Sequence, residues 1–288
     1  MLALCNLSSV IVLSAVITRF LFLIPRTIFI MQSTCHAVSH FLDTMSPQTH
    51  YVLYLDIDGT LAEFQLNPKD SFIPTKTLHL LSCLIALKIP VILLTGRCLA
   101  DAQNLAQGLN VDIAASHGLD LYIKQNRDVP KLDLDVIQKL QQHVTQACQG
   151  MALRLEYKDY SIALHYREYP QSAHCVEQLA QQLVHGFPDF YLKKGQYVWE
   201  IAPKAANKGH AIQRIQHALA LEYTHPIFIG DDVTDEDGFA MVNSLGGSSI
   251  KVGQGATQAA YRVQTIQACV DFLAQFTTKI VHQRHMEK

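Results

Sequence analysis

Three groups of polar residues each follow a short apolar run, and their side chains could bind a metal ion and a phosphate. They are Asp56-Ile57-Asp58-Gly59-Thr60, Thr95-Gly96-Arg97 and Gly230-Asp231-Asp232-x-x-Asp235. Carboxylates brought together would repel one another unless a cation lay among them, and hard carboxylate oxygens select Mg²⁺. One aspartate pair at a strand end is equally well explained as a turn or a helix cap. Two such groups on neighbouring strands favour a magnesium site.

The apolar runs before these groups predict the strands of a parallel sheet. Residues 51–55, 90–94 and 112–116 are apolar nearly throughout, and residues 75–88 and 99–109 between them have helical periodicity. Strands of this kind that alternate with helices indicate a parallel sheet covered on both faces. Ligands bind such sheets at the carboxyl ends of the strands. We therefore expect the three polar groups to share one crevice.

The middle of the chain has a different pattern and predicts an inserted α+β domain. Residues 153–157 and 161–166 alternate apolar and polar positions, as half-buried antiparallel strands do, between helical stretches. The parallel pattern returns afterwards, with a strand at 226–229. We expect a core domain formed by residues 46–118 and 199–280, with an α+β cap formed by residues 119–198.

Composition excludes several classes of protein. Of 288 residues, 49% are apolar and 17% charged, so the chain is neither disordered nor collagen-like. With 23 basic and 25 acidic residues the formal net charge is −2, which gives no indication of a nucleic-acid partner. Seven cysteines form no C-x-x-C pair, and this pattern fits a reducing compartment better than a disulfide framework. A cytoplasmic location is expected.

Residues 1–45 form a hydrophobic N-terminal extension that we expect to lie outside the enzyme. They contain three charged residues, and segment 7–24 is nearly continuously apolar and is broken by Arg19. The segment could be a membrane anchor or an export signal. An upstream misassigned start is equally consistent, since Met31 and Met45 both precede the first clear strand. A buried helix of the fold is the least favoured interpretation. Membrane contact is expected only if residues 7–24 are a genuine anchor.

The order of the polar groups resembles the signature of the haloacid dehalogenase-like phosphatases over about residues 50–275. That signature is Asp-x-Asp-Gly-Thr, Thr-Gly-Arg, a lysine here matched by Lys208, and Gly-Asp-Asp-x-x-Asp. The resemblance implies an α/β fold with a Rossmannoid parallel-sheet core and an inserted C2-type α+β cap. It also implies hydrolysis of a phosphate ester through an aspartyl-phosphate.

The resemblance implies a role for each core residue. Asp56 would attack phosphorus, and Asp58 would protonate the leaving oxygen and then deprotonate water. Thr95 and Lys208 would bind the phosphoryl oxygens and stabilise their charge. Four more residues in the same loops are expected to contact the substrate: Gly59, Thr60, Gly96 and Arg97.

A magnesium ion is the cofactor that the resemblance implies. Its ligands would be Asp56, the backbone carbonyl of Asp58, and Asp231. Asp232 and Asp235 are expected to bind it through water or to support the direct ligands.

Several further stretches resemble the trehalose-6-phosphate phosphatase family. The stretch Gly-Asp-Asp-Val-Thr-Asp-Glu-Asp-Gly-Phe at 230–239 matches that family's fourth motif. Other matches are Glu-x-Lys at 156–158, His-Tyr-Arg at 165–167, Trp-Glu-Ile at 199–201 and Ser-His-Gly at 116–118. The resemblance implies a magnesium-dependent enzyme of trehalose biosynthesis that releases trehalose and phosphate. The expected partner is a small sugar phosphate, and the oligomeric state is left open.

Sugar recognition is expected to come from polar residues of the cap and its entry. A disaccharide carries many hydroxyls and no charge besides its phosphate, so charged or amide groups must read those hydroxyls. Asp120 stands where the family usually has a glutamate. Glu156 and Lys158 could equally form a solvated cross-strand pair. The predicted contacts are His117, Asp120, Glu156, Lys158, His165 and Glu200.

Other functions are compatible with the same motifs. One is a different capped sugar phosphatase, acting on sucrose 6-phosphate or mannosyl-3-phosphoglycerate. A second is a sugar phosphomutase, which shares the nucleophile and the base. A membrane-attached binding protein with a decayed site is the non-enzymatic alternative, and the complete motif set argues against it.

Overall fold

The computed structural model describes residues 36–65, 68–129, 132–195 and 197–286. Residues 33–288 form one compact unit that contains two sheets. The apolar segment 7–24, which was interpreted as an anchor, a signal or a product of a misassigned start, lies outside the described residues. No helix in the described part of the chain is long and apolar enough to cross a membrane.

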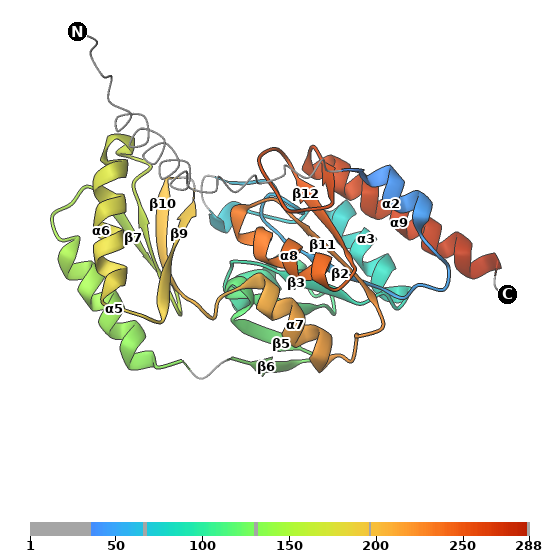
Figure 1. The fold of residues 1–288 in the computed structure, drawn as a ribbon, viewed down its shortest axis with the longest axis horizontal. Coiled ribbons are helices and arrows are strands. Elements are labelled where there is room, and N and C mark those ends of the chain that lie inside the picture. Colours follow the sequence, from blue (N-terminus) through green and yellow to red (C-terminus); the bar gives the residue numbers. More distant parts are fainter. Residues whose placement is uncertain (1–35, 66–67, 130–131, 196, 287–288) are drawn as a thin grey trace, which may run out of the picture. The chain divides into compact units, whose positions relative to one another are not determined.

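The larger sheet has nine strands in the order β1-β13-β12-β11-β2-β3-β4-β5-β6 (Figure 1). Every neighbouring pair is parallel except β4–β5 and β5–β6. The strands are β1 (His36–Ala37), β2 (Tyr51–Leu55), β3 (Val91–Leu94), β4 (Asp112–Ala115), β5 (Asp120–Ile123), β6 (Asn126–Asp128), β11 (His225–Gly230), β12 (Ser248–Val252) and β13 (Tyr261–Val263). The predicted parallel sheet is confirmed.

Helices cover both faces of this sheet, which explains why β2 and β3 are apolar at every position. Leu53, Leu55 and Leu93 pack with α2 (Val38–Thr44), α3 (Thr75–Ala86), α4 (Leu99–Ala106) and α9 (Ile266–Met286). The alternate residues Val52 and Tyr54 pack on the other face with α7 (Lys208–Ala218) and α8 (Glu236–Ser244). Short 3₁₀ helices lie at Pro68–Asp70, Ser116–Gly118, Pro170–Ser172 and Val233–Asp235.

The smaller sheet has four antiparallel strands in the order β7-β8-β10-β9. They are β7 (Arg154–Tyr157), β8 (Ile162–His165), β9 (Phe190–Gly195) and β10 (Val198–Pro203). Trp199 and Ile201 point to one face and pack against α5 (Leu134–Ala147) and α6 (Ala173–His185). Because side chains alternate along a strand, Glu200 points to the opposite face, which these helices leave open.

The boundaries expected between core and cap differ from the division of the strands between the two sheets. The cap was expected to span residues 119–198, but β5 pairs with β4 and β6 pairs with β5, so both belong to the larger sheet. At the other end β10, which was assigned to the core from residue 199, pairs with β8 and β9 as far as Pro203. The β5–β6 hairpin turns back along an edge of the parallel sheet, so its local pattern resembles that of the antiparallel insert.

Part of the N-terminal extension belongs to the fold, contrary to the expectation that all of residues 1–45 lie outside it. Strand β1 pairs with β13, and Phe41 and Leu42 of α2 are buried. The Phe41 ring contacts Phe272 of α9, with centroids 6.0 Å apart. Residues 36–45 therefore complete the face of the sheet that α9 covers.

Candidate active site

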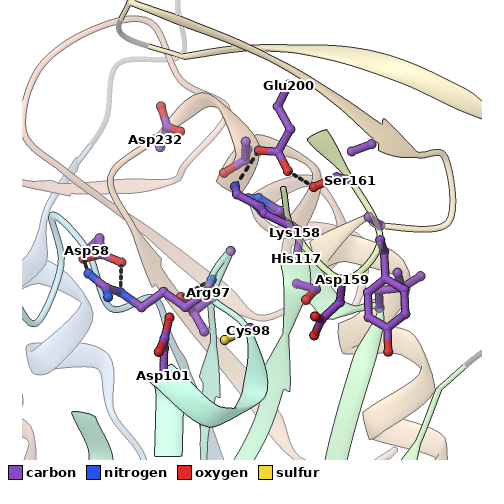
Figure 2. A pocket seen from close by; sticks show the side chains of 18 of the residues that line it. Asp58, Arg97, Cys98, Asp101, His117, Lys158, Asp159, Ser161, Glu200 and Asp232 are labelled. Carbon is purple, nitrogen blue, oxygen red and sulfur yellow. Dashed lines mark hydrogen bonds and ion pairs between the residues drawn. The ribbon is translucent and has the colours of Figure 1, made fainter. Parts of the chain in front are cut away.

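A cavity of about 460 Å³ lies where the loops after the parallel strands meet the open face of the smaller sheet (Figure 2). Residues from all three polar groups line it, as the strand-end argument predicted. They are Asp56, Asp58, Thr95, Gly96, Arg97, Asp231 and Asp232. The smaller sheet and its turn contribute Glu156, Lys158, Ser161 and Glu200.

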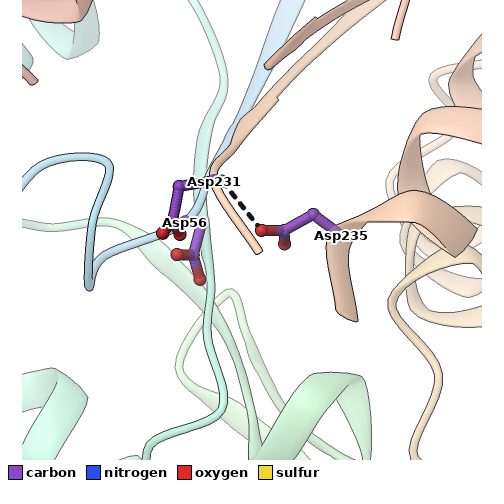
Figure 3. Close-up of side chains that lie close together, drawn as sticks. All are labelled: Asp56, Asp231 and Asp235. Carbon is purple, nitrogen blue, oxygen red and sulfur yellow. Dashed lines mark hydrogen bonds between the residues drawn. The ribbon is translucent and has the colours of Figure 1, made fainter. Parts of the chain in front are cut away.

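Three carboxylates converge at the base of the site (Figure 3). Asp56 follows β2, Asp231 and Asp235 follow the adjacent strand β11, and their nearest oxygens all lie within 4.8 Å of one another. Burial raises the pKa of Asp56 well above its ordinary value, and the charges of Asp235 and Asp231 add to this effect. Burial and the same kind of repulsion raise the pKa of Asp231 to about 7. These carboxylates are thus held close together at an electrostatic cost.

The donor set fits a hard divalent cation. Asp231 Oδ1 is buried and has no hydrogen-bond partner among the described residues. An unpartnered buried carboxylate oxygen is costly, and a cation placed against it would remove that cost. Oxygen ligands of this kind suit Mg²⁺.

Lys208 is the buried counter-charge of the cluster. It starts α7, where the side chain of Asn207 caps the helix by accepting a hydrogen bond from the His210 amide at 2.9 Å. Its Nζ donates to Asp56 Oδ1 at 2.7 Å and to Asp235 Oδ1 at 2.5 Å. Although burial opposes the charged form, Asp235 and Asp56 raise the pKa of Lys208 above its ordinary value.

Asp235 holds the loop after β11 rather than facing the cavity. Its Oδ2 accepts hydrogen bonds from the backbone amides of Asp231 at 3.0 Å and Asp232 at 2.9 Å. Its other oxygen accepts from Lys208, and the side chain is fully buried. Asp56 and Asp231 are therefore the carboxylates of this trio that line the cavity.

Asp58 forms a bidentate ion pair with Arg97. Nε and Nη2 of Arg97 each donate to one carboxylate oxygen of Asp58 at 2.6 Å, and Ser71 Oγ donates at 3.3 Å. Both Asp58 and Arg97 line the cavity. The arginine of the second polar group thus contacts the predicted acid–base residue directly.

The loops after β3 and β4 pack tightly against each other. Thr95 Oγ1 accepts from the Arg97 amide at 3.2 Å, and the His117 amide donates to the Thr95 carbonyl at 2.8 Å. A Cβ at Gly96 would lie 2.6 Å from Cε1 of His117, so only glycine admits the imidazole there. Burial, reinforced by the positive charges of Lys193 and Lys208, lowers the pKa of His117 well below its ordinary value.

The open face of the smaller sheet supplies a polar cluster above the carboxylates. Glu200 accepts from Lys158 Nζ at 3.0 Å and from Ser161 Oγ at 2.5 Å (Figure 2). Glu156 lines the cavity and pairs with His165 Nε2 at 2.7 Å. Glu156 and Lys158 therefore do not pair with each other, and each has a partner on another strand or turn.

Four predicted substrate contacts are not among the residues that line the cavity: Gly59, Thr60, Asp120 and His165. Asp120 is 1% exposed and forms a bidentate ion pair with Arg127 of the same hairpin, at 2.9 and 2.6 Å. Its carboxylate is therefore already paired with Arg127, and this arrangement gives no support to the predicted contact with sugar. Thr60 is fully buried, and His165 pairs with Glu156, which lines the cavity.

Some lining residues were missed by the sequence reasoning. Phe64, 67% exposed, lies in the loop after the first polar group, and Asp101 and Tyr160 come from other segments. Nothing in periodicity or motif spacing distinguishes them from ordinary surface residues. Ser161 could have been found, since it lies between Lys158 and His165 in the stretch that matched the cap motif.

Comparisons with known proteins agree with this geometry. The family model described as trehalose-phosphatase matches residues 54–267. The trehalose-6-phosphate phosphatase of Escherichia coli (strain K12) is 33% identical over 250 residues, which cover 84% of this chain and 92% of that protein.

Solved structures share the fold. The C-terminal domain of the C. albicans trehalose-6-phosphate phosphatase superimposes with a TM-score of 0.74 at 19% identity, covering 85% of this chain and 97% of that one. A haloacid dehalogenase-like hydrolase from Bacteroides thetaiotaomicron gives a TM-score of 0.60 at 14% identity, covering 79% and 99%. The fold is thus haloacid dehalogenase-like, and the chain belongs to the trehalose-phosphatase family.

Proposed function

We propose that this chain hydrolyses trehalose 6-phosphate to trehalose and inorganic phosphate. The observation that supports this best is that one cavity contains two groups of polar residues with different expected roles. A carboxylate and lysine cluster suited to phosphoryl transfer lies at its base, and the hydroxyl-reading groups Lys158 and Glu200 lie above it. Membership of the trehalose-phosphatase family supports the choice of sugar.

In the proposed reaction Asp56 is the nucleophile. One of its oxygens attacks phosphorus while the bond from phosphorus to the sugar oxygen breaks, which gives an aspartyl-phosphate. Asp58 donates a proton to the leaving sugar oxygen. It then takes a proton from the water that attacks the aspartyl-phosphate, which restores Asp56 and releases phosphate.

Lys208 and Thr95 support this chemistry. Lys208 Nζ already lies 2.7 Å from Asp56 Oδ1, so its charge is in place to stabilise the phosphoryl oxygens as negative charge builds up. Thr95 is buried and lines the same cavity as Asp56. Its hydroxyl is the expected hydrogen-bond partner of a phosphoryl oxygen.

A bound Mg²⁺ would be held by Asp56, Asp231 and the backbone carbonyl of Asp58, and it would neutralise charge on the phosphoryl group. Asp235 keeps Asp231 in position through the backbone of the loop, and Asp232 lies at the rim of the cavity. Lys208 donates to Asp235, and Asp231 Oδ1 has no hydrogen-bond partner among the described residues, so the Asp231 carboxylate is available for this role.

The smaller sheet is proposed to act as the cap. We infer that the segment from α5 to β10 is the cap and that the nine-stranded sheet, with the β5–β6 hairpin, is the core. Glu156, Lys158 and Glu200 on its open side would bind sugar hydroxyls, and a sugar lacking those hydroxyls would leave them unpaired.

The experiment that tests this function measures phosphate release by the purified chain. The panel contains trehalose 6-phosphate, glucose 6-phosphate, sucrose 6-phosphate and mannosyl-3-phosphoglycerate, each with Mg²⁺ and with EDTA. We expect trehalose 6-phosphate to have the highest kcat/KM, EDTA to abolish release, and Asp56→Asn to abolish it as well. Asp271→Asn on the exposed surface of α9 is the matched control and should leave release unchanged.

Two results would contradict the proposal. If trehalose 6-phosphate is hydrolysed no faster than glucose 6-phosphate, the substrate assignment is wrong. If an isomerised sugar phosphate forms in place of free phosphate, the enzyme is a phosphomutase.

A further inference from the structure

Phe64 is an exposed aromatic residue in the active-site cavity, and the proposed reaction gives it no role. It lies in the loop after β2, beyond the first polar group, and it lines the cavity together with Asp56 and Asp231. The residue is 67% exposed, although phenylalanine is among the residues most often buried. Ligand cavities combine aromatic walls with a few placed polar groups, so an aromatic surface left open inside one is available to a ligand.

The edge of the Phe64 ring lies beside the acidic cluster. A Cβ built at Gly59 would lie 2.7 Å from Cε2 of Phe64 and 2.1 Å from Oδ2 of Asp231, so the ring edge and this carboxylate approach the same point. An aromatic ring carries partial positive charge at its edge and partial negative charge on its faces, so a carboxylate beside the edge is favourable. One edge of the ring is thus held in place, and most of the residue stays accessible.

The position of Phe64 decides which part of a substrate it can reach. Asp56 is the proposed nucleophile and Asp231 the proposed metal ligand, so the phosphoryl group would lie beside these two carboxylates. A ring next to Asp231 would therefore meet the part of the substrate that is bonded directly to the phosphate. In a sugar phosphate that part is the phosphorylated sugar unit.

The polar residues of the cavity leave one kind of sugar surface without a partner. Glu156, Lys158 and Glu200 come from the smaller sheet and its turn, and they suit the hydroxyls around the rim of a sugar ring. The faces of a sugar ring carry C–H groups, which gain free energy when they leave water. The hydrogens of these groups bear a slight positive charge, so the negatively polarised face of an aromatic ring attracts them.

We propose that Phe64 is a specificity-determining residue whose ring packs against the C–H face of the sugar unit that bears the phosphate. The contact would favour phosphates of ring sugars over phosphates of open-chain alcohols. It would contribute to substrate binding rather than to the chemical step. This inference rests on the proposed function only in taking the ligand to be a sugar phosphate.

The test compares Phe64→Ala with Phe64→Tyr and with Phe72→Ala. Tyrosine keeps the aromatic ring. Phe72 is the matched control, because it is 57% exposed and is not among the residues that line the cavity. For each variant kcat and KM are measured with the best sugar phosphate of the panel and with glycerol 1-phosphate, which has hydroxyls and no ring.

We expect F64A to raise KM for the sugar phosphate about 5- to 50-fold, because a sugar would cover one face of the ring rather than bury it fully. The kcat of this variant should stay close to that of the wild type, since the contact is made equally in the ground state and the transition state. With glycerol 1-phosphate, kcat/KM should stay within about twofold of the wild type. F64Y should keep nearly the KM of the wild type, and F72A should match the wild type with both substrates.

The Tm separates sugar binding from support of the metal site. Because the ring edge adjoins Asp231, a ring with a purely structural role would leave that carboxylate displaced when it is removed, and the rise in Tm caused by Mg²⁺ would shrink. We expect F64A to keep the Tm of the wild type without metal, since an exposed side chain contributes little to stability. The variant should also keep the full rise in Tm with Mg²⁺.

Several results would overturn the inference. An F64A enzyme with the KM of the wild type for the sugar phosphate excludes the contact. A parallel loss with glycerol 1-phosphate, a lower Tm or a smaller effect of Mg²⁺ assigns the ring a structural role at the metal site instead. An F64Y enzyme as impaired as F64A shows that the aromatic ring is not what binds.

The wild type distinguishes failure of this inference from failure of the proposed function. A wild type that hydrolyses glycerol 1-phosphate as efficiently as every sugar phosphate has no sugar subsite, which contradicts both. A preference for a sugar other than trehalose 6-phosphate contradicts the proposed function alone, since Phe64 is then tested on that sugar.

Discussion

Gly59 controls how closely the loop after β2 approaches Asp231, the proposed metal ligand. Its φ is +83°, in the left-handed region that glycine enters without strain. A Cβ built there would lie 2.1 Å from Asp231 Oδ2 and 2.7 Å from Phe64 Cε2. Gly59 was predicted to contact the substrate. The structure gives it a different task, because it leaves room for Asp231.

Gly59→Ala should therefore damage the metal site. The added methyl group must displace the Asp231 carboxylate, so we expect phosphate release to fall by at least about a hundredfold, as misplacement by about 1 Å does elsewhere. The increase in Tm caused by Mg²⁺ should shrink in the same variant. Gly108→Ala is the matched control, since Gly108 has φ +81° and open space around its Cβ position. Equal activity of the two variants would show that the contact with Asp231 does not matter.

The convergence of the proposed catalytic aspartates could be predicted because each follows a strand of a parallel sheet. Strand ends at one edge must meet, so Asp56 and Asp231 were expected together and lie together. Asp120 could not be placed in this way. Its partner Arg127 lies across a hairpin, and no spacing rule shows that the two side chains turn toward each other.

At the scale of the elements, helix α5 holds the turn that carries Lys158, a proposed sugar contact. Gln141 Nε2 donates to the carbonyls of Lys158 at 2.9 Å and Ser161 at 3.3 Å, the two ends of the β7–β8 turn. The side chains of Lys158 and Ser161 both donate to Glu200. The helix, the turn and β10 thus form one hydrogen-bonded chain that ends in the cavity.

Gln141→Leu should loosen this turn without disturbing the core. The leucine keeps the size of the side chain and removes the donor to both carbonyls, so Lys158 and Ser161 would sample other positions. We expect KM for the sugar phosphate to rise about 5- to 30-fold, the loss of one or two hydrogen bonds, with hydrolysis of p-nitrophenyl phosphate unchanged. Gln142→Leu, at an exposed position of the same helix, should alter neither value. A parallel loss with both substrates would instead indicate general destabilisation.

The elements themselves were easier to predict than their pairing. Periodicity predicted helices near α3, α4, α5 and α7 and strands near β2, β3 and β11, because each pattern reflects local burial. Strand β10 was assigned to the wrong sheet. Its partners β8 and β9 are decided by tertiary contacts, and the lysine motif that follows it belongs to the core.

At the scale of the whole molecule, helices α2 and α9, near the two ends of the described chain, pack against each other. Phe41 of α2 packs against Phe272 of α9 and Tyr51 of β2. Sequence reasoning assigned residues 36–45 to an extension because the run before them is apolar and the first clear strand comes later. A short helix whose buried face has only two residues, Phe41 and Leu42, leaves almost no periodic signal.

The stability of the whole molecule should depend on pH through the acidic cluster. The pKa of Asp231 rises from an ordinary value of 3.8 to about 7, so the folded state binds this proton more tightly than the unfolded state does. Without metal, the contribution of this group to the free energy of unfolding is complete at low pH and is lost as pH rises from about 4 to 7. Asp56, with its pKa raised in the same direction, adds to the loss.

Magnesium should reverse that loss, and its effect should grow with pH because the ion binds only deprotonated carboxylates. At a concentration of about 100 Kd, Mg²⁺ should raise the free energy of unfolding by about 2.7 kcal/mol at pH 8. At pH 5, where Asp231 is protonated, the increase should be much smaller. Urea unfolding with and without Mg²⁺ at the two pH values measures both. Asp231→Asn removes the titrating group and a ligand together, so this variant should lose the pH-dependent increment. An equal magnesium effect at both pH values, or one retained in the variant, would place the ion elsewhere in the molecule.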